Sequence, residues 1–183
     1  MAVLIVCTPS NAQDIVYDDD GKIYHPLPTL STQELDERVL ISQNVERQRL
    51  GIAPLRWNAQ LARDANVWAQ YLARYDRTDL PHDQRSRNNE GENLWTGTIH
   101  DYTPEEMVGS WIDERKDYRP GVFPYVSRTG DWEDVGHYTQ IIWEDTREVG
   151  CALAHNSLDE FLVCRYAKPG NRDGQTAIHS RLR

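Results

Sequence analysis

The chain has 183 residues, the length of a single domain with room for an apolar core. Its formal net charge is −9, and an acidic surface disfavours the phosphate contacts on which nonspecific nucleic-acid binding depends, so we expect no nucleic-acid partner. No window holds the roughly 18 consecutive apolar residues of a membrane-spanning helix.

The N-terminal segment, residues 1–12, has features of a secretion signal. A short apolar run ends at Cys7, and the small residues Ser10 to Ala12 suit cleavage before Gln13. A basic region ahead of the apolar run is missing, so the alternative is a plain apolar terminus. We expect a secreted or periplasmic protein. Residues 13–30, which are polar and contain three consecutive aspartates, are predicted to form an extended arm.

Capping signals and apolar periodicity predict the helices. Ser31, followed three residues later by Glu34, has the spacing of a capping box. Asn58 can cap a second helix, whose apolar residues recur at helical spacing. Pro104 at a first helical turn opens a third. The predicted helices span residues 32–50, 59–75, 104–116 and, as a short element, 137–143.

Two strands are predicted near the C-terminus, at 149–155 and 161–166. Their hairpin is apolar on both faces, because Leu162 lies on one face while Phe161 and Val163 lie on the other. A sheet with two apolar faces must be covered on both sides. The sequence therefore predicts an α/β protein, a three-layer α/β/α sandwich with a small, mainly antiparallel sheet between helices.

The same hairpin predicts a disulfide. With a loop at 156–159, Cys151 faces Cys164 across the two strands. Directly opposed residues in a non-hydrogen-bonded pair lie close enough to bridge, and an even pair of cysteines in an exported protein favours the bond. The alternative is two buried free thiols in a reduced compartment.

Two ionisable residues lie in apolar sequence. His137 follows Gly136 at the front of an apolar helical turn, and Glu114 falls in the apolar stripe of the third helix. A buried, unpaired carboxylate is costly, so we expect Glu114 to have a partner, a metal or a shifted pKa. The alternative is a residue at the helix edge that reaches water. His82 and Glu92, taken alone, are typical of exposed loop and turn residues.

Four motifs occur in the order found in one known family: Gly-Glu-Asn-Leu at 91–94, Gly-His-Tyr-Thr-Gln-Ile-Ile-Trp at 136–143, Gly-Cys at 150–151 and Val-Cys-Arg-Tyr at 163–166. The chain thereby resembles the CAP superfamily of cysteine-rich secretory proteins, insect-venom antigens and plant pathogenesis-related proteins. The similarity runs from about Leu40 to Asn171. It implies a CAP domain at 31–171 with the family's sandwich fold, followed by a polar tail at 172–183. The small cysteine set suggests a bacterial-type member.

The resemblance also implies a central cavity built from two histidines and two glutamates, which here are His82, Glu92, Glu114 and His137. It implies that zinc binds through the two histidines, with water completing the site. Glu92 and Glu114 would then orient ligands or act as a general base. Matching positions expected to support the cleft are Asn93, Tyr138 and Gln140, and those expected to form a hydrogen-bonded scaffold are Asn44 and Arg47.

Three functions remain open. The first is a binding module with a divalent-metal cleft, whose partner is a small hydrophobic ligand such as a sterol or fatty acid, an envelope component or a protein. The second is a metal-assisted hydrolase that uses zinc-bound water, since the sequence contains no motif for a covalent nucleophile. The third is a structural secreted domain whose polar cleft is a satisfied internal network. Zinc is the one cofactor expected.

Overall fold

The computed structural model describes residues 16–17, 23–24, 30–84 and 89–179. The predicted signal segment at 1–12 and most of the predicted arm lie outside the described residues. Within the arm, strand β1 (Val16–Tyr17) pairs antiparallel with strand β2 (Ile23–Tyr24). No helix in the described part of the chain is long and apolar enough to cross a membrane.

The helices begin where the capping signals place them. Ser31 and Glu34 form the predicted capping box, and the side chain of Asn58 accepts hydrogen bonds from the first turn of the second helix. Thr103 and Glu106 form a second capping box, with Pro104 in the first turn behind it. The helices are α1 (Thr32–Arg49), α2 (Ala59–Arg74), α3 (Pro104–Asp113) and α4 (Gly136–Ile141), with 3₁₀ turns at Glu114–Lys116 and Trp132–Val135.

A four-stranded mixed sheet forms the middle layer. Its strands are β3 (Arg56–Trp57), β4 (Gly91–Thr98), β5 (Glu148–His155) and β6 (Asp159–Ala167), in the order β3-β5-β6-β4. Only β3 runs parallel to its neighbour, and the other pairs are antiparallel. The predicted register is confirmed, because Cys151 lies opposite Cys164 and the two form a disulfide.

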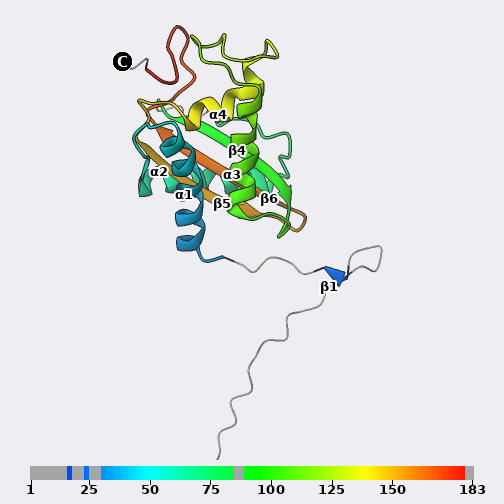
Figure 1. Cartoon of the computed structure of the whole chain (residues 1–183). Helices are drawn as coiled ribbons and strands as arrows, with labels where there is room; N and C mark the ends of the chain where they lie inside the picture. Colours follow the sequence, from blue (N-terminus) through cyan, green and yellow to red (C-terminus); the bar gives the residue numbers. More distant parts are fainter. Residues whose placement is uncertain (1–15, 18–22, 25–29, 85–88, 180–183) are drawn as a thin grey trace, which may run out of the picture.

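Helices cover both faces of this sheet, as predicted. Helix α2 packs on β5 and β6, while α1, α3 and α4 lie on the opposite side (Figure 1). Two buried apolar clusters correspond to the two interfaces. The cluster under α2 contains Phe161 and Val163, and the cluster under α1 and α3 contains Leu162 and the disulfide. The three-layer α/β/α sandwich is thereby confirmed.

Three details differ from the prediction. The third helix ends at Asp113, and the backbone tightens into a 3₁₀ turn from Glu114 onward. Strand β3 has two residues, too few for a periodicity signal, and was not predicted. The described part of the tail pairs with the body, since the backbone N–H of Phe123 donates to the carbonyl of Gln175 and Ala177 is buried.

Candidate functional site

A cavity of about 710 Å³ opens beside the start of β4, the N-terminal turn of α4 and the segment after β6. Its apolar wall includes Leu80, Leu94, Trp132 and Pro169, and its polar wall includes His82, Asp83, Glu90, Glu92, Asn93, Glu133, His137, Gln140 and Arg165. Three of the four residues expected from the resemblance therefore share one cavity. The cavity joins apolar surface to titratable groups, which is the usual composition of a ligand site.

His82 is held by Glu92. The Nδ1 atom of His82 lies 2.7 Å from Oε1 of Glu92, and the same oxygen accepts a hydrogen bond from the backbone N–H of Asp83 at 3.2 Å. The side chain of Glu92 is 8% exposed, whereas that of His82 is 55% exposed. The imidazole of His82 thus lies at the cavity edge and is hydrogen-bonded to a largely buried carboxylate.

His137 is held in the same manner by Glu114. The Nδ1 atom of His137 lies 2.6 Å from Oε1 of Glu114, whose Oε2 accepts a hydrogen bond from the backbone N–H of Tyr138 at 2.9 Å. The ring of Trp111 stacks on the imidazole, with centroids 5.9 Å apart. The expected partner of Glu114 is therefore a histidine and a backbone amide.

Glu114 itself does not line the main cavity. It borders a separate polar depression together with Ser110, Asp113 and Lys116. The reason is that α3 ends at Asp113, so Glu114 caps the helix and reaches across to α4 from behind His137. The helical stripe that pointed to Glu114 is interrupted at that residue.

Each of the two imidazoles has a second ring nitrogen, Nε2, that can contact a ligand. A carboxylate only accepts hydrogen bonds, so Nδ1 of His82 and of His137 carries a proton, and in a neutral imidazole Nε2 then carries the lone pair. Among the described residues, no hydrogen bond engages Nε2 of either ring. Carboxylates that orient imidazoles through Nδ1 are a recurrent outer layer of metal sites. The described residues nevertheless contain no group of three His, Cys, Asp or Glu side chains placed to hold a metal ion.

Of the expected supporting residues, Asn93 and Gln140 line the cavity and Tyr138 does not. The side-chain amide of Asn93 donates to the carbonyl of His137 at 3.1 Å. Gln140 accepts from the backbone N–H of Gly170 at 2.8 Å. The hydroxyl of Tyr138 points into the core, where it donates to Glu46 at 2.8 Å.

Gly91 makes room for Gln140. A Cβ atom at Gly91 would lie 2.0 Å from Oε1 of Gln140, so a side chain there would force Gln140 to move and to give up its hydrogen bond from Gly170. The glycine of this motif therefore reflects the packing of β4 against α4. Asn44 and Arg47 form the expected scaffold: Asn44 bonds both backbone groups of Leu55, and Arg47 is fully buried and donates to four carbonyl groups.

Arg165 was not predicted as a site residue. It lies on β6, is 2% exposed, and is the only arginine or lysine among the described residues that line the cavity. Its Nη2 atom lies 3.0 Å from Oδ2 of Asp83 and forms an ion pair with Oε2 of Glu92 at 2.9 Å. Burial raises the pKa of the nearby Glu90 carboxyl, and the charge of Arg165 opposes that rise. A charged residue inside the apolar run of β6 was the available signal, because a buried guanidinium requires acidic partners.

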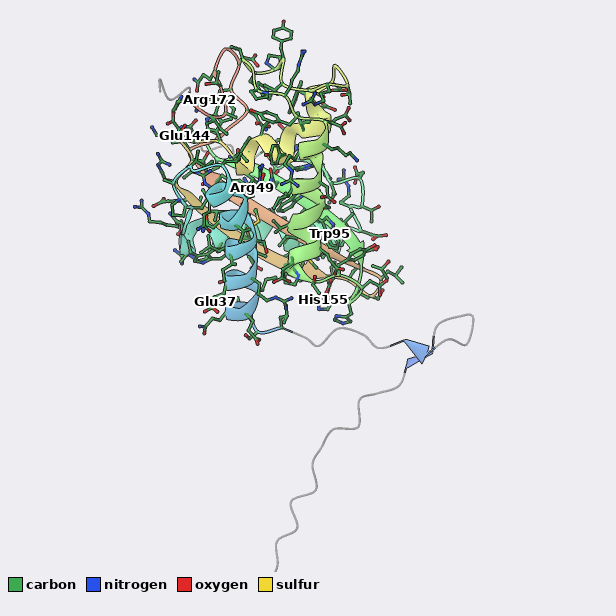
Figure 2. The ribbon with its side chains drawn as sticks, in the orientation of Figure 1. Glu37, Arg49, Trp95, Glu144, His155 and Arg172 are labelled. Atoms are coloured by element: carbon green, nitrogen blue, oxygen red, sulfur yellow. A yellow bond between two sulfur atoms is a disulfide. The ribbon has the colours of Figure 1, made fainter. Side chains whose placement is uncertain are left out.

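A second pocket of about 510 Å³ lies at the other end of the sheet. It is lined by residues of α1 and α3 and by His100, His155 and Glu160. Figure 2 shows His155 at the opposite end of the molecule from Arg172, which follows the segment lining the first cavity. Nδ1 of His100 lies 3.6 Å from Oε1 of the buried Glu160. Burial raises the pKa of that carboxyl.

Comparisons with known sequences agree with the motifs. A family model described as the cysteine-rich secretory protein family matches residues 40–166. The pathogenesis-related protein PR-1 of Medicago truncatula is 32% identical over 149 residues, which cover 80% of this chain and 81% of that protein. Venom allergen 5 of Vespa velutina is 33% identical over 122 residues, 64% of this chain and 57% of that protein.

Solved structures share the fold. The structure of BmVAL-1 aligns with a TM-score of 0.68 and 22% identity over 82% of this chain and 84% of that chain. The structure of NaASP2 with Zn²⁺ aligns with a TM-score of 0.69 and 18% identity over 85% of this chain and 90% of that chain. At these identities the likeness establishes the fold alone.

Proposed function

Because the chain belongs to the cysteine-rich secretory protein (CAP) family, we propose that it is an exported binding module whose cleft holds a divalent cation, zinc in the first instance, next to a small ligand or a segment of a partner protein. The observation that carries this proposal is the pair of imidazoles in one cavity. Each has its Nδ1 held by a carboxylate and leaves its Nε2 unengaged by the described residues.

The donor set fits zinc as an open site. Neutral imidazole is a common zinc ligand, and carboxylate-held histidines are typical of metal sites. His82 and His137 would supply the two protein ligands, and the cleft has room for water or a ligand group to complete the coordination. Bound zinc would supply Lewis acidity in the cleft. Since two protein ligands are fewer than a structural site has, we expect moderate affinity.

Export is supported by the disulfide between Cys151 and Cys164. Both cysteines are buried, and disulfides of this kind persist in oxidising compartments. We therefore infer a secreted, periplasmic or extracellular location. A hydrophobic ligand or an apolar side chain as partner is supported by the cavity wall, which includes Leu80, Leu94 and Trp132.

Binding is favoured over hydrolysis by what the two glutamates already do. A general base needs a carboxylate oxygen that can take a proton from water. Both oxygens of Glu114 accept hydrogen bonds, from His137 and from the backbone of Tyr138. Glu92 contacts His82 and Asp83 through one oxygen and Arg165 through the other. These contacts suit carboxylates that position other groups.

Zinc calorimetry at about pH 7.5, where histidine is largely neutral, tests the proposal. We expect one zinc ion per chain, and loss of that binding in the His82→Ala/His137→Ala double variant. The matched control is His155→Ala/His179→Ala, which removes two exposed imidazoles outside the cleft. Equal affinity of the wild type and the cleft variant would defeat the proposal. Equal loss in the control variant would defeat it too.

A further inference from the structure

Arg165 connects three separate parts of the chain at the floor of the cleft. It lies on β6, while Glu92 lies on β4 and Asp83 lies in the loop that follows α2. A single guanidinium nitrogen, Nη2, is 2.9 Å from a carboxylate oxygen of Glu92 and 3.0 Å from one of Asp83. The contact with Asp83 is a hydrogen bond, whereas the contact with Glu92 is a buried ion pair without hydrogen-bond geometry.

Arg165, Glu92 and Asp83 contact one another in a closed set, and His82 is bonded to its Glu92 member. Oε2 of Glu92 forms an ion pair with Arg165, and the other oxygen, Oε1, meets Nδ1 of His82 at 2.7 Å. Asp83 is tied twice, by its carboxylate to Arg165 and by its backbone N–H to Glu92. On the far side of His82, the indole N–H of Trp68 donates to the carbonyl of Pro81 at 3.0 Å. The loop is thus anchored immediately before and after the imidazole.

We propose that Arg165 is the positioning residue for His82: it fixes both the place of the imidazole and its tautomer, with the proton on Nδ1 and the lone pair of Nε2 available to a ligand. Arg165 does not touch the imidazole and acts through Glu92 and Asp83. The inference deepens the proposed function and rests on it for the role of His82 as a ligand, but the positioning itself concerns the metal-free protein.

The other imidazole supplies an internal reference. His137 is also oriented by a carboxylate, but Glu114 is anchored by the backbone N–H of Tyr138 at 2.9 Å rather than by a side chain. Substituting Arg165 removes the anchor of one imidazole and leaves the anchor of the other in place. A positioning role therefore predicts a change confined to His82, whereas a general loss of folding would affect both rings.

The test compares the full-length chain with its Arg165→Gln variant by ¹⁵N NMR of the imidazoles, without metal, at about pH 8, where free imidazole is neutral. In the wild type we expect both histidines as the single tautomer protonated at Nδ1. In the variant we expect His82 to become a mixture of tautomers while His137 stays unchanged. Zinc affinity should fall about tenfold to a hundredfold, the usual effect of losing an outer-layer contact.

Asp83→Asn gives a milder variant, which leaves the Arg165 contact with Glu92 in place. We expect a smaller shift of the same His82 signals, and this variant carries the test if Arg165→Gln does not fold. Arg38→Gln, which breaks the ion pair with Glu105 outside the cleft, should leave the signals of His82 and His137 unchanged.

Unchanged His82 signals in a folded Arg165→Gln variant, or in Asp83→Asn if only that one folds, would overturn the inference. Equal changes at His82 and His137 would overturn it as well. A wild type that binds no zinc but shows the selective change at His82 would refute the zinc proposal and leave the positioning role standing.

Discussion

Oε1 of Glu114 lies 2.6 Å from Nδ1 of His137, while Oε2 of the same carboxylate accepts the backbone N–H of the next residue, Tyr138. One carboxylate therefore ties an imidazole ring to the backbone turn that carries it. Since Glu114 is at the end of α3 and His137 is at the start of α4, this contact also fixes two helix ends against each other.

Glu114→Gln should lower zinc affinity about tenfold. The amide has one acceptor oxygen, so it can keep the bond to His137 or the bond to the Tyr138 N–H, but not both. Calorimetry of the folded variant measures the change. If Glu114 were instead a general base, the same variant would keep its zinc affinity while losing turnover, and that result would contradict a positioning role.

Replacing Cys151 and Cys164 together by alanine should lower the free energy of unfolding by about 3 kcal/mol, because the bond closes a loop with a sequence separation of 13 residues. Urea unfolding with and without reductant measures the difference. Reductant should lower the free energy of unfolding of the wild type and leave that of the double variant unchanged. A wild type equally stable in reductant would show that the bond does not constrain the unfolded chain.

The fold could be predicted because its determinants are local. Apolar residues on both faces of the β5–β6 hairpin predicted a sheet covered on both sides, and the hairpin register placed Cys151 opposite Cys164, which the structure confirms. Capping residues such as Ser31 and Asn58 marked the starts of helices. These features depend on neighbours in sequence or on a single turn, so the local sequence is enough to predict them.

The candidate site was predictable in its members but not in their arrangement. Family motifs named His82, Glu92, Glu114 and His137, yet only the fold shows that they form two separate pairs. Helical periodicity placed Glu114 within a stripe, although α3 ends just before it. Arg165 was missed because its role depends on β4 and a distant loop meeting β6, and no local pattern encodes that meeting.

Glu46→Gln should destabilise the protein by about 2 kcal/mol at neutral pH, since it weakens charged hydrogen bonds to a buried group. Glu46 is 4% exposed, accepts from Arg49 at 2.7 Å and from the Tyr138 hydroxyl at 2.8 Å, and pairs with Arg115 at 3.1 Å. Burial alone would raise the pKa of its carboxyl, but the hydrogen bonds from Arg49 and Tyr138 and the arginine charges hold that pKa below its usual value of 4.5.

The sign of the pH dependence follows from that lowered pKa. A carboxyl with a lower pKa in the folded state contributes stability above its unfolded pKa, near 4.5, and loses it as the pH falls through the folded value. The stability gap between wild type and Glu46→Gln should therefore narrow below about pH 4. Glu37→Gln is the control, because Glu37 is exposed near the other end of α1 (Figure 2) and should change stability by less than about 0.5 kcal/mol. A gap that stays constant with pH would contradict the assignment.

Gly150→Ala should be the most damaging small substitution in the sheet. A Cβ atom at Gly150 would lie 2.2 Å from the backbone nitrogen of Ala62 and 2.5 Å from the carbonyl oxygen of Asn58, so the first turn of α2 rests directly on β5. Neither contact is with a flexible side chain, and moving α2 away from β5 would strain the hydrogen bond from the Asn58 N–H to the carbonyl of Val149. We expect a loss of about 3 kcal/mol or more in the free energy of unfolding.

Gly109→Ala is the matched control for Gly150→Ala. Gly109 lies inside α3, and a Cβ atom there would meet nothing within 4 Å. Alanine should stabilise that helix by about 0.5–1 kcal/mol, because glycine loses more backbone entropy on folding. Urea unfolding of both variants should thus give shifts of opposite sign. A Gly150→Ala variant as stable as the wild type would mean that α2 can move away from β5, and the Gly-Cys motif would then have no packing explanation on its α2 side.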